Sequence, residues 1–175
     1  VKQPCSLNRL SNLIKATGTP CSPSTVMEYV RYLQESCLLI SIDNYASKFV
    51  EKETIKKHYF VDNGLLHLFI NNPNISLLEN LCTITLYKKY GKGLYYYNRN
   101  IEVDFYVPDE GLAVQASYQM SDEETIEREV KALVTLHGLY PLKRAMIITY
   151  EDEGEIVRDG LKIEIRPAWK WVLEG

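Results

Sequence analysis

The fold of this chain is decided by two neighbouring segments, Ile101-Glu102-Val103-Asp104-Phe105-Tyr106-Val107 and Leu112-Ala113-Val114-Gln115-Ala116-Ser117-Tyr118. Both segments are short and rich in apolar, β-branched and aromatic residues, which favour extended strands. The sequence Pro108-Asp109-Glu110-Gly111 lies between them and is typical of a turn. Together the three stretches predict a β-hairpin.

Polar residues alternate with apolar ones in both predicted strands. A period of two places Glu102, Asp104 and Tyr106 on one face of the first strand. In the second strand, Gln115 and Ser117 share a face. If the hairpin aligns its polar faces, we expect Asp104 to lie near Gln115 and Ser117.

The elements on either side of the hairpin predict an α/β sandwich with a mixed central sheet. Apolar spacing indicates a helix that runs to about residue 90, followed by a strand over 94–98. After the hairpin, Ser121-Asp122-Glu123-Glu124 is typical of a capping box at the start of a helix. Strands are expected over 145–150 and 161–165, and a last turn of helix around Trp169. The resulting order, α-β-β-β-α-β-β-α, belongs to the α/β (α+β) class.

The first third of the chain has the layout of a winged helix. Apolar spacing predicts a helix over 6–15, and Ser22-Pro23 predicts the start of a second helix. Strands over 38–42 and 57–61 follow, joined by a long polar loop. The second helix is expected to bury one apolar stripe, which consists of Val26, Tyr29, Val30, Leu33 and Cys37. In a winged helix this second helix enters the major groove of DNA.

The loop Asn71-Asn72-Pro73-Asn74 is the predicted domain boundary. We therefore expect a winged-helix domain over 1–70 and a second domain over 71–175. The two parts differ in charge: residues 1–60 hold eight Lys and Arg against five Asp and Glu, and residues 61–175 hold twelve against eighteen. The first part is thus +3 and the second −6, which hints at nucleic-acid contact in the first.

Several classes of protein are excluded by composition. No apolar run approaches the ~20 residues of a membrane helix, so no membrane partner is expected. The four cysteines lack the spacing of a zinc site, which favours reduced thiols in a cytoplasmic protein without a structural metal. The chain starts at Val1 without Met or a signal sequence, and we expect it to be part of a longer protein.

Carboxylates of the second part suggest a type of chemistry. Glu79 on the predicted helix and Asp104 on the strand could share a corner with Gln115 and Ser117. In a magnesium-dependent phosphodiesterase, acids from a helix and a strand hold Mg²⁺ against the phosphate. A lysine on the next strand orients the attacking water and stabilises the developing charge.

Five motifs carry a resemblance to a known family. They occur in its order and are Tyr59-Phe60-Val61-Asp62-Asn63-Gly64-Leu65-Leu66, Leu77-Leu78-Glu79-Asn80-Leu81, Tyr95-Tyr96-Tyr97, Glu102-Val103-Asp104-Phe105 and Glu123-Glu124-Thr125-Ile126-Glu127-Arg128-Glu129. The chain resembles the C-terminal region of prokaryotic AAA+-type ATPases, which ends in a domain of unknown function similar to PD-(D/E)xK nucleases and Holliday-junction resolvases. The resemblance covers nearly the whole chain.

The resemblance implies a fold, an absent partner domain and a cofactor. A winged helix would precede a restriction-endonuclease-like α/β sandwich. An N-terminal P-loop ATPase domain of the same protein would bind ATP, but no Walker A motif occurs in these residues. No cofactor is therefore expected in this fragment, apart from Mg²⁺ if its nuclease site is active.

The resemblance also assigns vestigial catalytic positions. Glu79 matches the helix acid, Asp104 the strand acid, and Gln115-Ala116-Ser117 the Glu-x-Lys tripeptide. If the site is active, Glu79, Asp104 and Gln115 are the expected metal ligands, because an amide oxygen can still ligate. Ser117 removes the motif lysine, a loss that costs about 10²–10⁴ in rate. Lys131 on the following helix is the candidate replacement, although it also fits a surface pair with Glu127.

The predicted winged helix offers candidate nucleic-acid contacts. Ser24, Thr25 and Arg31 lie on the exposed side of its second helix, and Lys56 and Lys57 lie near the wing. Glu28 and Glu35 dilute the positive charge there, and winged helices also bind proteins, so either partner remains open.

Three functions follow from these patterns. The first is a region that binds nucleic acid, with DNA as the candidate, or a partner protein, and whose nuclease-like domain is degenerate and inactive. The alternative is an active Mg²⁺-dependent endonuclease or resolvase-like enzyme. A third is a module for protein contacts or oligomer formation alone.

Overall fold

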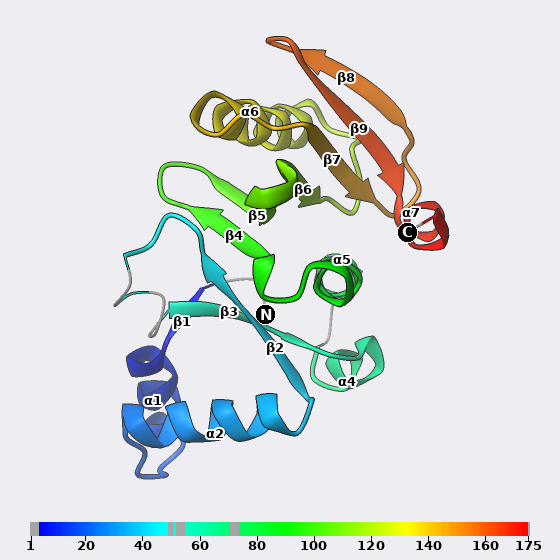
Figure 1. Cartoon of the computed structure of the whole chain (residues 1–175). Helices are drawn as coiled ribbons and strands as arrows, with labels where there is room; N and C mark the ends of the chain where they lie inside the picture. Colours follow the sequence, from blue (N-terminus) through cyan, green and yellow to red (C-terminus); the bar gives the residue numbers. More distant parts are fainter. Residues whose placement is uncertain (1–3, 49–50, 52–54, 71–73, 175) are drawn as a thin grey trace.

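The computed structural model describes residues 4–48, 51, 55–70 and 74–174. Its strands form one mixed β-sheet in the order β1-β3-β2-β4-β5-β6-β7-β9-β8 (Figure 1). The pairs β2–β4, β6–β7 and β7–β9 are parallel, and the other neighbouring pairs are antiparallel. The strands are β1 (Cys5–Ser6), β2 (Leu39–Asn44), β3 (Ile55–Phe60), β4 (Tyr95–Asn98), β5 (Glu102–Val107), β6 (Leu112–Ala116), β7 (Arg144–Thr149), β8 (Gly154–Arg158) and β9 (Leu161–Pro167).

Helices flank this sheet, so the predicted α/β class and mixed sheet are confirmed. The helices are α1 (Leu7–Ala16), α2 (Pro23–Glu35), α4 (Asn63–His67), α5 (Asn74–Tyr90), α6 (Glu123–Leu139) and α7 (Ala168–Glu174), with short 3-10 turns η1 (Gly91–Gly93) and η2 (Pro108–Glu110). None of the helices in the described part of the chain combines the length and the apolar character that a membrane crossing requires.

Side-chain caps fix where several helices begin. Ser6, Ser22, Asp62 and Asp122 each accept a hydrogen bond from the backbone N–H three residues further on, at 2.7 to 3.2 Å. Such a bond satisfies one of the unpaired donors at a helix start. The cap of α6 is Asp122 rather than Ser121, the first residue of the predicted capping box.

Two apolar layers hold the helices on the sheet. Leu78, Cys82 and Leu86 of α5 pack on one face with Phe105 and Val107 of β5. Val130, Leu133 and Leu136 of α6 pack on the other face with Val103 and Tyr106 of the same strand. In Figure 1, α5 and α6 accordingly lie on opposite sides of the sheet.

The alternation predicted for β5 is wrong beyond Asp104. Tyr95 of β4 pairs with Tyr106, whereas Tyr97 pairs with Val103, so Tyr96 alone opposes both Asp104 and Phe105. This extra residue is a β-bulge, which reverses the facing of the residues that follow it. Tyr106 therefore joins the α6 face, while Asp104 and Phe105 both face α5.

The sheet continues through the predicted domain boundary. Parallel pairing of Asp43 with Tyr95 and of Asn44 with Tyr96 joins β2 to β4. The buried Asn44 side chain strengthens this junction, since its amide donates to the Asn98 carbonyl at 2.6 Å and accepts from the Asn98 N–H at 3.0 Å. Residues 71–73 of the predicted boundary loop lie outside the described residues.

Two strands and one apolar face depart from the sequence prediction. The strands β1 and β8 were not predicted, because β1 has two residues and β8 buries none of its side chains completely. The apolar stripe predicted for the second helix is buried only at Val26, whereas Tyr29 and Leu33 are exposed. Helical spacing identified an apolar face, but the described elements that contact α2, which are α1 and β2, cover only part of it.

A partly buried histidine on β3 predicts a pH dependence. Burial, with the nearby Lys56, lowers the pKa of His58 from 6.5 to about 4, and Ser41 bonds its Nδ1 at 2.7 Å. Between these pH values the unfolded chain binds a proton that the folded protein does not, so the free energy of unfolding falls as the pH drops. Between about pH 7 and pH 5, we expect the free energy of unfolding to fall by about 1–2 kcal/mol less in the His58→Gln variant than in the wild type. Urea unfolding at pH 7 and at pH 5 measures this free energy for both proteins. An equal fall in the two proteins would contradict the lowered pKa of His58.

Candidate functional site

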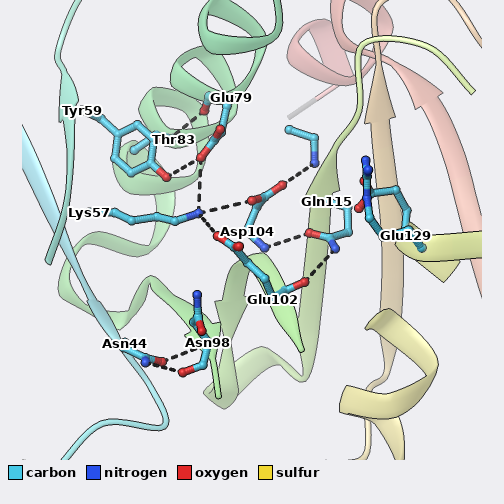
Figure 2. A network of polar contacts seen from close by, with 12 residues as sticks. Asn44, Lys57, Tyr59, Glu79, Thr83, Asn98, Glu102, Asp104, Gln115 and Glu129 are labelled. Carbon is cyan, nitrogen blue, oxygen red and sulfur yellow. Dashed lines mark hydrogen bonds and ion pairs between the residues drawn. The ribbon is translucent and has the colours of Figure 1, made fainter. Parts of the chain in front are cut away.

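A buried lysine at the centre of β3 organises the candidate site. Lys57 is 0% exposed, and it shares a face of β3 with the equally buried Tyr59. The intervening His58 is only partly buried. The period of two along β3 therefore directs Lys57 and Tyr59 together toward α5 and β5, as Figure 2 shows.

The Lys57 ammonium lies where three carboxylates converge. Its Nζ is 2.9 Å from Glu102 Oε1, 3.3 Å from Asp104 Oδ1 and 3.5 Å from Glu79 Oε1 (Figure 2). The Tyr96 ring adds a cation–π contact, with its centroid 5.4 Å from Nζ. An ammonium has three donors, so these three acceptors match its capacity.

The charge of Lys57 is stabilised by this arrangement. Burial by itself would lower the pKa of Lys57, because it disfavours the charged form. The carboxylates of Asp104, Glu79 and Glu102 outweigh burial and hold the pKa well above its ordinary value. Lys57 is therefore a permanently charged group inside the protein at neutral pH.

Glu79 reaches the site from α5. Asn80 fixes this helix against β3, because its side-chain amide accepts from the Phe60 N–H and donates to the Phe60 carbonyl, both at 2.9 Å. The neighbouring Glu79 then accepts a hydrogen bond from the Tyr59 hydroxyl at 2.7 Å. Burial and the charges of Glu79 and Asp104 raise the pKa of Tyr59, so it remains a neutral donor.

The hairpin brings Asp104 and Gln115 together, as expected from the polar faces. The Asp104 N–H donates to Gln115 Oε1 at 2.8 Å, and the Gln115 amide donates to the Glu102 carbonyl at 3.1 Å. The Ala116 N–H donates to Asp104 Oδ2 at 3.1 Å. The Gln115 side chain therefore makes two hydrogen bonds to the backbone of β5, which add to the hydrogen bonds between the two strands of the hairpin.

These contacts do not fit a Mg²⁺ site made of Glu79, Asp104 and Gln115. Glu79 and Asp104 both direct an oxygen at the Lys57 ammonium, and the Gln115 oxygen accepts from the backbone. A divalent cation among these oxygens would meet the ammonium, and like charges repel. In the part of the chain that the structure describes, His, Cys, Asp and Glu side chains form no group of three or more that could hold a metal ion.

An open cleft of about 1060 Å³ lies over the site. Asp104, Gln115 and Ser117 line it, together with Arg128 and Lys131 of α6. The Ser117 hydroxyl donates to the Gln119 carbonyl at 3.1 Å. Lys131, the candidate replacement for the motif lysine, is thus a cleft residue, but it is exposed, and the cation that pairs with Asp104 among the described residues is Lys57.

Carboxylates dominate this cleft. Its lining includes Glu79, Glu102, Asp104, Asp122 and Glu129, against the two cations Arg128 and Lys131. The Arg128 guanidinium is also neutralised, because it donates to Glu129 Oε1 at 2.7 Å. The cleft is therefore acidic, which disfavours the close approach of phosphates.

The predicted nucleic-acid contacts do not assemble into a basic surface. Ser24 and Thr25 bond through their hydroxyls to Ser22 at the start of α2. Arg31 pairs with Glu35 at 3.6 Å, and Lys56 pairs with Asp43 at 3.0 Å. The expectation that Lys57 lies near the wing as a phosphate contact is wrong, since the side chain is buried among carboxylates.

Comparison with known proteins adds a distant relative. The chain is similar to an uncharacterized protein of Methanocaldococcus jannaschii, with 32% identity over 184 residues. The match covers 96% of this chain and 40% of the relative, so the chain spans less than half of that protein. No family model matches the sequence, and no solved structure matches it.

Lys57 is the site residue that sequence reasoning assigned to the wrong surface. A signal for its position exists, since it is spaced two residues from Tyr59 in a strand whose other face carries Lys56 and His58. The acidic partners of Lys57 come from segments 22 to 47 residues away. Their convergence depends on tertiary structure.

Loss of the Lys57 charge should destabilise the protein. In the Lys57→Met variant, three carboxylates would remain close together without a cation, and breaking such a buried pair costs about 3–5 kcal/mol. The matched control is Lys56→Met, which removes a partly exposed pair with Asp43 and should cost at most about 1 kcal/mol. Urea unfolding followed by circular dichroism measures both. A similar decrease in the free energy of unfolding in the two variants would show that the carboxylates do not need the Lys57 charge.

Proposed function

We propose that this chain is the C-terminal binding region of a AAA+-type ATPase, with a winged helix followed by a PD-(D/E)xK-like nuclease domain that no longer cuts. The single observation that carries this proposal is the Lys57 ammonium, which lies 2.9 to 3.5 Å from Glu79, Glu102 and Asp104. An internal cation there takes up the carboxylates that a nuclease needs for its metal ion.

The chemistry of phosphodiester cleavage supports the loss of activity. Such an enzyme needs a metal ion against the phosphate and a group that activates the attacking water. Here Glu79 and Asp104 bond to protein donors, and Ser117 stands at the position of the motif lysine. What remains is an ion cluster that holds β3, α5 and β5 together.

The arrangement of elements supports the two-part assignment. The order β1-α1-α2-β2-β3, with its antiparallel β2–β3 pair, agrees with a winged helix. The acids of α5 and β5 lie beside β6, which agrees with a nuclease-like core. The relative from M. jannaschii is more than twice as long as the matched segment, which leaves room in it for an ATPase domain.

A protein partner is the second candidate. The cleft is acidic, and Met27, Tyr29 and Leu33 of α2 are 40 to 57% exposed. Exposed apolar groups of this kind occur at protein interfaces. Under this candidate the winged helix binds a protein, such as the ATPase domain or a second copy, in place of DNA.

A cleavage assay tests the proposal against the active-nuclease alternative. The wild type and the Asp104→Asn variant are incubated with supercoiled and branched DNA in the presence of Mg²⁺ or Mn²⁺. We expect no metal-dependent cleavage by either protein, since Lys57 already neutralises Asp104 and Glu79.

A second readout is independent of activity. Titration of the wild type with Mn²⁺, followed by electron paramagnetic resonance, should show no site that Asp104→Asn removes. Cleavage or Mn²⁺ binding that is present in the wild type and absent from a folded Asp104→Asn variant would establish the nuclease instead. Asparagine has nearly the same size as Asp104, so we expect the variant to fold. Circular dichroism checks that it does.

A further inference from the structure

A basic cluster lies at the C-terminal end of α5, outside the acidic cleft. Lys88 and Lys89 occupy the last turn of the helix, and Lys92 lies in η1 directly after it. All three are exposed. Between Glu79 and Glu102 the sequence contains no Asp or Glu, so this cluster has no acidic neighbour along the chain.

The three lysines are set apart by their close spacing. Among the exposed cations that the structure describes, some pair with a carboxylate, as Arg158 does with Glu127 at 3.2 Å, and others, such as Lys15 and Lys143, make no ion pair. Lys88, Lys89 and Lys92 make no ion pair among the residues that the structure describes. The cluster therefore places three unpaired positive charges within five residues of the chain.

The helix dipole explains only part of this cluster. Cations in the last turn of a helix are favourable by about 0.3–1 kcal/mol, which accounts for Lys88 and Lys89. Lys92 lies beyond the helix, where that effect does not require it. The cluster also interleaves with Tyr87, Tyr90 and Tyr95, and the Lys89 ammonium lies 5.8 Å from the Tyr90 ring centroid.

We propose that Lys88, Lys89 and Lys92 form the surface through which this chain contacts the phosphate backbone of nucleic acid. Lysine ammonium groups bind phosphates without reading sequence, and the partly exposed tyrosines next to them along the chain add contact area to sugars or bases. The proposal rests on the binding role proposed above. It assigns that role to the end of α5 rather than to α2, whose Arg31 is paired with Glu35 and whose exposed residues also include Glu28.

Neutralising the cluster tests this assignment. The triple variant Lys88→Gln/Lys89→Gln/Lys92→Gln is compared with Lys15→Gln/Lys143→Gln/Lys162→Gln, which removes the same charge at scattered exposed positions. Fluorescence anisotropy with labelled single- and double-stranded DNA of mixed sequence gives the affinity over a range of salt concentrations. Thermal unfolding confirms that both variants fold.

The cluster variant should bind DNA at least about tenfold more weakly at low salt, and its plot of log affinity against log salt should be shallower by about 2 to 3. The scattered variant should keep most of its affinity and its slope. Equal weakening of the two variants, unchanged binding by the cluster variant, or no binding by the wild type would each overturn the proposal. Competition by polyglutamate as effective as that by DNA would point instead to an acidic protein partner.

These measurements are independent of cleavage. Weak or absent DNA binding would leave the proposed loss of nuclease chemistry standing, because that proposal depends on Lys57 and Asp104. Conversely, metal-dependent cleavage would overturn the inactive site and leave the lysine surface of α5 as the place where the substrate is held.

Discussion

The rest of this structure depends on one buried ammonium. Lys57 comes from the N-terminal part of the chain, and its carboxylate partners come from α5 and β5 of the C-terminal part. Lys57 and Glu79 are costly to bury alone, since an unpaired charge in a protein interior loses its hydration. The elements that carry them must therefore stay together, which makes the relative position of β3, α5 and β5 a condition of folding rather than a result of loose contact between domains.

Polar contacts elsewhere reinforce the same junction. Asn80 ties α5 to the backbone of β3, and Asn44 ties β2 to the end of β4. Both side chains are buried, so each bond replaces water that the groups have lost. The apolar layers supply the bulk of the burial, whereas these amides and the Lys57 cluster determine which strands and helices meet.

Sequence reasoning predicted the elements whose signals are local. Turn chemistry identified the hairpin at Pro108, and Ser22-Pro23 marked a helix start, because such signals act within a few residues. The corner formed by Glu79, Asp104 and Gln115 was also anticipated. The bulge opposite Tyr96 was not, since it depends on pairing with another strand, and neither was the burial of Lys57. Both are products of contacts between distant segments, which single-residue patterns do not encode.

The unbroken sheet has a consequence for any attempt to divide the protein. Cutting the chain near residue 70 would separate β2 from β4. Each would become an exposed edge strand with unpaired backbone donors and acceptors. Exposed edges of this kind recruit strands from other molecules, so the separate halves would tend to associate with one another or aggregate.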